Sequence, residues 1–194
     1  MIWRKVIVGN KDLPIGRLIG VLDNADWVNQ GRKHLREDGI CPFCQRRTIT
    51  DELKNQLEDF FSGEYEQDVN HIKHCINQYG ACANELLRRI NALRTSLGTY
   101  PAAGIDVSKL DTIIELLNGY FSKNKAEMLI KEKEPGRTIS LTETVATIRL
   151  VEQLVVDGND TIAKHNSMVE NYTSEKNVLV ADICLSRPVP VTDV

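Results

Sequence analysis

A heptad repeat between residues 65 and 97 limits the fold more than any other feature of this sequence. Apolar side chains recur there at alternating steps of four and three residues: Tyr65, Val69, Ile72, Ile76, Tyr79, Ala83, Leu86, Ile90, Leu93 and Leu97. This spacing keeps a narrow apolar stripe on one side of an α-helix, as in a coiled coil. At 1.5 Å per residue, a helix over 64–98 is about 50 Å long, too long for the body of a small globular domain. We therefore expect a long helix that pairs with another helix.

A second stripe follows a predicted turn. Gly98 and the Pro- and Gly-containing segment 100–104 predict the end of the first helix and a hairpin connection. Ser108 is the expected N-cap of the next helix. Its stripe consists of Val107, Leu110, Ile114, Leu117, Phe121, Asn124 and Met128.

A third, less regular stripe begins after the helix-stopping sequence at 134–136. Thr142 is the expected cap, and Gly158 and Lys176 occupy two positions of the stripe where an apolar residue is expected, so we expect a kink near 157–159. The apolar repeat otherwise runs through Ile148, Val151, Val155, Ile162, His165, Val169, Tyr172, Leu179 and Ile183. The sequence therefore predicts antiparallel coiled-coil helices over 64–185, followed by a tail over 186–194.

Residues 1–63 form a different unit. Pro14 lies near the start of a short predicted helix, Asp23 or Asn24 caps a second one that extends to residue 37, and Thr50 caps a third over 51–61. No stretch alternates apolar and polar residues for long enough to form a sheet. We predict an all-α fold with a small helical head over 1–63 and a long antiparallel coiled coil.

Composition excludes several classes of protein. The formal net charge of −3 and the pI near 5.8 do not indicate nucleic-acid binding. No apolar run reaches the roughly 18 residues of a membrane span, and we find no secretion signal, so we expect a cytoplasmic protein without membrane contact. The sequence contains neither a Walker A pattern nor the other common catalytic motifs. It is therefore expected not to be an enzyme.

The Cys-Pro-Phe-Cys sequence at 41–44 is the strongest candidate site. The five cysteines are an odd number in a chain expected to be cytoplasmic, which argues against a disulfide framework. Cys41 and Cys44 supply two of the four ligands that zinc requires. Two chains could each donate this pair, or His71 and Cys75 could complete a site within one chain. A third alternative is that no metal binds and the cysteines pack as small apolar residues.

The surroundings of this motif bear on a redox alternative. A thiol oxidoreductase places its first cysteine at a helix N-terminus after a buried strand, which lowers the pKa of the thiol. The residues before Cys41 are polar and are not typical of a strand. Trp27 is expected to pack beneath the motif, with Phe60, Phe61 and Tyr65 on the other side.

Part of the sequence resembles a known family. The segment Asp26-Trp27-Val28-Asn29-Gln30-Gly31, the motif Cys41-Pro42-Phe43-Cys44-Gln45, the residues Phe60, Phe61 and Tyr65, and a His-Asn pair at 165–166 are similar to bacterial SMC-like ATPases that include the anticodon nucleases of the PrrC and RloC type. The resemblance covers about residues 15–180 and implies the helical insertion between the two ATPase halves. It implies no nuclease residues in this segment.

These observations lead to a functional expectation. The resemblance implies a non-catalytic coiled-coil and zinc-knuckle segment of an ATPase of the phage-defence or tRNA-restriction type. Its role would be dimerisation or docking of a partner coil. The alternatives are a stand-alone helical adaptor that binds a partner coil and a thiol oxidoreductase that uses Cys41 and Cys44.

Overall fold

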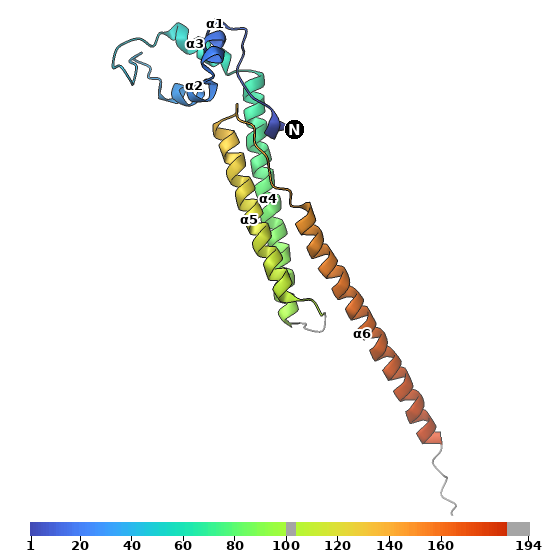
Figure 1. The fold of residues 1–194 in the computed structure, drawn as a ribbon. Coiled ribbons are helices and arrows are strands. Elements are labelled where there is room, and N and C mark those ends of the chain that lie inside the picture. The colour runs from blue at the N-terminus through green and yellow to red at the C-terminus, as the bar shows by residue number, and fades with distance from the viewer. Residues whose placement is uncertain (100–103, 186–194) are drawn as a thin grey trace, which may run out of the picture. The chain divides into compact units, whose positions relative to one another are not determined.

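The computed structural model describes residues 1–99 and 104–185. Within these ranges the chain forms six α-helices and two short 3₁₀-helices and contains no β-strand, which confirms the all-α prediction (Figure 1). The α-helices are α1 (Pro14–Leu22), α2 (Ala25–Gly31), α3 (Asp51–Phe60), α4 (Glu64–Thr99), α5 (Val107–Lys133) and α6 (Val145–Leu185). The 3₁₀-helices are η1 (Ile2–Arg4) and η2 (Arg32–His34). None of the described helices is both long and apolar enough to cross a lipid bilayer.

The chain divides into two compact units. The first comprises Met1–Arg88 and Leu117–Thr144, and the second comprises Arg89–Leu116 and Val145–Val194. The first unit therefore contains the short helices together with part of α4 and of α5. The predicted domain boundary at residue 63 stays a prediction, and the predicted tail over 186–194 lies outside the described residues, as does most of the predicted turn over 100–104.

The stripe on α4 forms the interior face of that helix. Every position of the stripe is buried or half-buried. Its first position, Tyr65, is 5% exposed, and its last, Leu97, is 8% exposed. In the first unit α5 lies alongside it, with the ring of Tyr79 edge-on to that of Phe121 at 6.0 Å. In the second unit Arg94 of α4 forms an ion pair with Asp111 of α5. The long helix and its pairing with another helix are therefore confirmed.

The cap of α3 is as predicted, whereas those of the two later helices differ. Thr50 accepts a hydrogen bond from the Leu53 N–H at 3.2 Å, as predicted. At α5 the capping side chain is Asp106, which accepts from the N–H groups of Ser108 and Lys109, so the predicted Ser108 cap is wrong. A carboxylate reaches both free N–H groups at a helix start, where its negative charge is also stabilised.

Thr142 does not cap the third long helix, because that helix begins only at Val145 and Thr142 lies in the link before it. The Thr142 N–H donates to Oδ1 of Asn124 at 2.7 Å, and its carbonyl accepts from Nδ2 of the same side chain at 2.9 Å. Asn124 is buried on α5 and also donates to the Tyr79 hydroxyl at 2.9 Å. This contact holds Thr142 in an extended link, and α6 starts at Val145. The helix then continues without interruption through Gly158, where the sequence predicts a kink.

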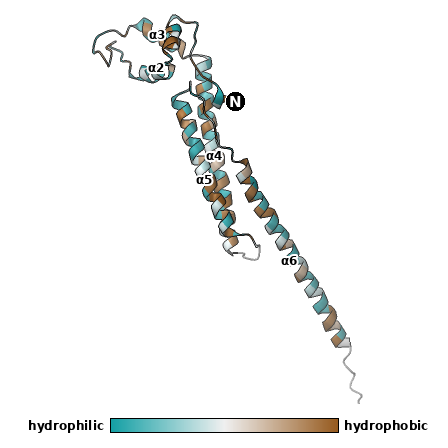
Figure 2. Ribbon diagram, viewed as in Figure 1, coloured by the Kyte–Doolittle hydropathy of each residue, from teal (hydrophilic) through white to brown (hydrophobic). Residues whose placement is uncertain are grey.

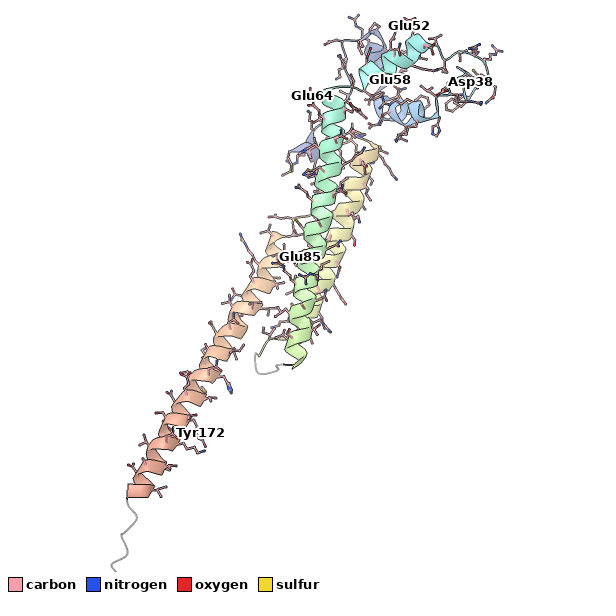
Figure 3. All side chains as sticks on the ribbon, turned by 180° about the vertical axis from the view of Figure 1, so that it is seen from behind. Asp38, Glu52, Glu58, Glu64, Glu85 and Tyr172 are labelled. Atoms are coloured by element: carbon pink, nitrogen blue, oxygen red, sulfur yellow. The ribbon has the colours of Figure 1, made fainter. Side chains whose placement is uncertain are left out.

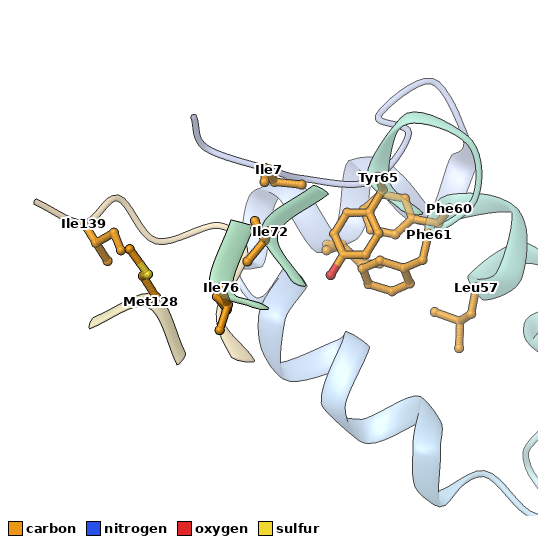
Figure 4. Packing of buried hydrophobic residues seen from close by; sticks show 10 residues of the cluster. Ile7, Leu57, Phe60, Phe61, Tyr65, Ile72, Ile76, Met128 and Ile139 are labelled. Carbon is orange, nitrogen blue, oxygen red and sulfur yellow. The ribbon is translucent and has the colours of Figure 1, made fainter. Parts of the chain in front are cut away.

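The core of the first unit is an aromatic cluster at the junction of α3 and α4 (Figure 4). The rings of Phe60 and Phe61 meet edge to face at 4.7 Å, and those of Phe61 and Tyr65 at 4.9 Å. Ile7, Ile19 and further apolar side chains pack around them. Burial of this cluster joins the N-terminal segment and the short helices to the start of α4.

A buried lysine in the first unit links the N-terminal segment to the loop after α5. The Lys131 ammonium is fully buried near the end of α5 and donates to the carbonyls of Lys5 at 2.5 Å, Pro135 at 2.6 Å and Arg137 at 2.6 Å. Burial is the main influence on this side chain and lowers the pKa of Lys131. Three donors of one ammonium thus meet three carbonyls, and the N-terminal segment is joined to the loop after α5.

Candidate metal half-site

The Cys-Pro-Phe-Cys motif lies in a tight turn between η2 and α3. The turn is flanked by one isolated antiparallel bridge between Ile40 and Arg47. Inside it, the Cys41 N–H donates to the Arg46 carbonyl at 2.8 Å, and the Gln45 N–H donates to the Cys41 carbonyl at 2.9 Å. These backbone bonds hold the two cysteines on one small loop.

Two residues with positive φ shape this turn. Gly39 has a φ of 72°, and a Cβ there would lie 2.7 Å from the Ile49 carbonyl oxygen, so only glycine fits without a shift. Gln45 has a φ of 57°, and its side-chain amide donates to the Pro42 carbonyl at 2.8 Å. The Gln45 side chain therefore closes the turn around the motif.

The backbone of the turn is oriented toward the Cys41 sulfur. The N–H groups of Cys44 and then of Phe43 hydrogen-bond to it and lower the pKa of the Cys41 thiol, because they stabilise the thiolate. The Thr48 hydroxyl lies 3.9 Å from the Cys44 sulfur. Since the thiolate is the form that ligates metals, this turn favours the ligand state of Cys41.

An exposed pair of aromatic rings borders the turn. Phe43 is 79% exposed and Trp27 is 61% exposed, and the two rings stack with centroids 6.2 Å apart. The expectation that Trp27 packs beneath the motif is therefore wrong. The indole lies at the surface beside it, because the interior of the first unit is already filled by Phe60, Phe61 and Tyr65.

His71 and Cys75 form a second pair of candidate ligands, one turn apart on α4. The Cys75 sulfur lies 3.7 Å from Nε2 of His71. Two ligands of one tetrahedral zinc ion are separated by about 3.5 Å for these atom types, so the pair has a suitable spacing. Among the described residues, however, no three His, Cys, Asp or Glu side chains gather into a metal-binding group. The structure thus contains two separate pairs and does not assemble Cys41, Cys44, His71 and Cys75 into one site.

The geometry bears on the redox alternative too. Cys41 lies in the turn and not at the N-terminus of a helix, and no strand precedes it in the described chain. The lowered pKa of its thiol comes from the local N–H groups of the turn. Thiol exchange therefore lacks the strand-to-helix arrangement that it uses in oxidoreductases.

Sequence reasoning found the two cysteines but missed the residues that support them. Nothing in the sequence indicates that Gln45 has a positive φ, because glycine is the residue that usually occupies such a position. The stacking of Trp27 on Phe43 joins residues on either side of η2, and no local pattern predicts it.

Comparison with known proteins places the chain in a family. Residues 1–191 match the model of a family described as AAA domain. No curated protein and no solved structure matches the chain. Because the family model covers nearly the whole sequence, this chain belongs to the AAA domain family.

Proposed function

We propose that this chain is an association segment of an SMC-like ATPase, in which Cys41 and Cys44 of two chains hold one zinc ion between them. The observation that carries the proposal is a preorganised turn that offers two thiol ligands, which no third His, Cys, Asp or Glu side chain of the described residues joins. Zinc prefers four ligands in a tetrahedral arrangement, and thiolates are among its preferred donors. Two such turns together supply the complete set.

The surface around the turn supports pairing of two heads. Trp27 and Phe43 expose large apolar rings directly beside the cysteines. Aromatic side chains at the centre of an interface contribute much of its binding energy. Burial of these rings against a second copy would exclude water from the zinc ligands and reinforce the bridge.

Membership in the AAA domain family supports a mechanical role that serves ATP-hydrolysing parts. The sequence contains no Walker A pattern, and we propose that this chain does not itself hydrolyse ATP. Its role is mechanical: it holds two ATPase parts in register or docks a partner. The resemblance to PrrC- and RloC-type proteins further supports a parent protein that acts in phage defence or tRNA restriction.

The zinc content of the purified protein tests this proposal. With reductant and without chelator, we expect half a zinc ion per chain and a dimer that EDTA weakens. The variant Cys41→Ser/Cys44→Ser should lose both zinc and this EDTA-sensitive association. Cys82→Ser removes an exposed thiol on α4 and serves as the matched control.

Two results would contradict the proposal. One zinc ion per chain that is lost in His71→Ala would indicate closure within the chain by His71 and Cys75. The absence of zinc from freshly purified protein would make the turn a packing motif.

A second candidate function is a stand-alone adaptor for a partner coil. It is favoured by the long exposed part of α6, where the side chains from 159 to 183 are exposed. The adaptor predicts association that depends on α6 and is insensitive to chelation.

The thiol oxidoreductase is the remaining alternative and is favoured only by the lowered pKa of Cys41. The oxidoreductase alternative predicts that the protein reduces insulin disulfides, whereas the zinc-bridge proposal predicts no such activity.

A further inference from the structure

The first unit contains a cavity of about 580 Å³ that the association role proposed above does not use. Its walls come from η2 and the segment after it, from α3 and the turn that follows, and from the start of α4. Neither Cys41 nor Cys44 lines it, so a ligand bound here does not depend on the zinc bridge. A cavity of this size accommodates a small organic molecule or a few residues of a peptide.

The floor of the cavity, formed by its buried lining residues, is apolar. Leu57 is 7% exposed and Phe61 is 1% exposed, and both belong to the core cluster of the first unit. Leu57 comes from α3, in which hydrophobic residues are interspersed among hydrophilic ones (Figure 2). Because the core holds these two side chains in place, they offer a fixed apolar surface to the uncharged part of a ligand.

Arg32 holds a positive charge beside this floor. Its guanidinium lies over the ring of Phe61, with Cζ 4.7 Å from the ring centroid. Stacking of this kind occupies the face of a guanidinium and leaves the N–H donors at its edge available. Arg32 is half-buried, and no carboxylate in the described part of the chain forms an ion pair with it. A partly desolvated cation without a counter-ion favours the binding of an anion.

Lys54 adds a second positive charge to the wall. Its ammonium donates to the Glu37 carbonyl at 3.3 Å and to the Asp51 carboxylate at 3.4 Å. Both distances are long for hydrogen bonds, and an ammonium has three N–H donors. Lys54 therefore keeps donor capacity for a ligand.

The full set of charged lining residues limits the charge of the ligand. Four of them are basic: Arg32, Lys33, Arg36 and Lys54. Three are acidic and exposed: Glu37, Glu58 and Glu66. Glu58 lies on α3, close to the start of α4 (Figure 3). The lining thus has one net positive charge, which complements a single negative charge, whereas a phosphate dianion would meet stronger repulsion from the three carboxylates.

We propose that this cavity binds an organic monocarboxylate with an apolar body. The carboxylate pairs with the edge of the Arg32 guanidinium, because these two planar groups match in two parallel hydrogen bonds. The apolar body lies on Leu57 and Phe61, where its burial is favourable. A small acid and the C-terminus of a peptide both present this combination of groups, and the experiment distinguishes them.

Binding to the full chain is measured by two-dimensional ¹H–¹⁵N NMR. 4-Phenylbutyrate represents a small acid, and N-acetyl-Gly-Phe with a free carboxylate represents a peptide terminus. We expect saturable shifts of amides in 32–37 and 54–62, with dissociation constants in the millimolar range for ligands of this size. The neutral analogues, 4-phenylbutanol and the amide of the dipeptide, should bind about tenfold more weakly. The acid that binds more tightly identifies the source of the carboxylate.

Charge variants of the lining test the assigned contacts. Arg32→Gln keeps a planar group beside Phe61 without the charge and should weaken binding of both acids about tenfold. Arg32→Lys keeps the charge without the planar fork and should cause a smaller loss. Glu58→Gln removes one exposed negative charge and should tighten binding about twofold. Arg17→Gln on α1 lies outside the lining and is the matched control, with unchanged affinity.

Several results would overturn the proposal. These are shifts that do not saturate with either acid, equal affinity for an acid and its neutral analogue, and wild-type affinity in Arg32→Gln. Tighter binding of phenyl phosphate than of 4-phenylbutyrate would also contradict it, because the cavity would then prefer a dianion. Should Arg32→Gln fail to fold, the exposed position Glu58 decides, since unchanged or weaker binding in Glu58→Gln would contradict a carboxylate in this cavity.

Discussion

At the residue scale, the most consequential side chain is Lys131. A buried ammonium is tolerated only where hydrogen-bond acceptors surround it, and here three carbonyls do so. Lys131→Met keeps the length of the side chain but leaves these carbonyls unpaired. We expect it to lower the free energy of unfolding by about 3 kcal/mol or more, since each buried unpaired carbonyl costs about 1–3 kcal/mol. Urea denaturation measures this, with Lys133→Met, an exposed lysine at the same helix end, as a near-neutral control.

Asp26 provides a prediction on pH at the same scale. Its carboxylate accepts from the Gly136 N–H at 3.1 Å and 3.2 Å, and burial raises the pKa of Asp26 above its ordinary value. The folded state therefore binds a proton more tightly than the unfolded state, and this contribution to stability is lost as pH rises through the folded-state pKa. Asp26→Asn keeps an acceptor oxygen without the charge.

The stability of Asp26→Asn relative to wild type should therefore increase as pH rises from about 4 toward neutrality. Urea denaturation of both proteins across this range measures the difference. A difference that does not vary with pH would contradict the assigned role of Asp26.

At the scale of elements, Asn124 joins α5 to the start of the segment that leads to α6. Asn124→Leu would complete the apolar stripe, yet it leaves both backbone groups of Thr142 without a partner. We expect a loss of about 2–3 kcal/mol in the free energy of unfolding, since each buried unpaired group costs about 1 kcal/mol or more. Tyr79→Phe removes only the hydroxyl contact and should cost less. Equal losses would show that the backbone contacts contribute little.

The elements also show what the sequence could predict. The stripe of α4 was readable because its buried and half-buried positions repeat at a fixed spacing. On α5 the predicted stripe is buried from Leu110 to Met128, whereas its first position, Val107, is exposed and Ile113 is buried outside it.

The burial of Lys131 could not be predicted, although it continues the same spacing after Met128, because its three acceptors come from residues 5, 135 and 137. The position of the Asp106 cap and the surface position of Trp27 likewise depend on contacts that no periodicity encodes.

The candidate site divides in the same way. Two cysteines separated by two residues predict a turn with two ligands, and the turn is present. The geometry that lowers the pKa of Cys41 requires the backbone conformation of Gln45 and the N–H directions of Phe43 and Cys44. Backbone directions of this kind follow from the folded turn and not from residue types.

At the scale of the whole molecule, zinc-dependent pairing of two heads predicts an optical signal. Trp27 is 61% exposed, and burial at an interface moves its fluorescence to shorter wavelength. Addition of zinc to chelated protein should produce this shift at a stoichiometry of half an ion per chain. Trp27→Phe reports the background from Trp3, and Cys41→Ser/Cys44→Ser should abolish the shift. A shift that persists in this double variant would show that the fluorescence change of Trp27 does not depend on zinc binding by Cys41 and Cys44.

The uneven cover of α6 has a consequence for its lifetime as a helix. Side-chain packing protects backbone amides from exchange with solvent deuterons, whereas an uncovered helix opens by local fraying. Val151 is buried and the residues after Gly158 are exposed, so one continuous helix contains two regions with different opening free energies. In an isolated chain, deuterium uptake should rise within about one turn after Gly158. A partner that covers the residues after Gly158 would raise the free energy of opening in that region and slow its deuterium uptake, without changing any backbone hydrogen bond.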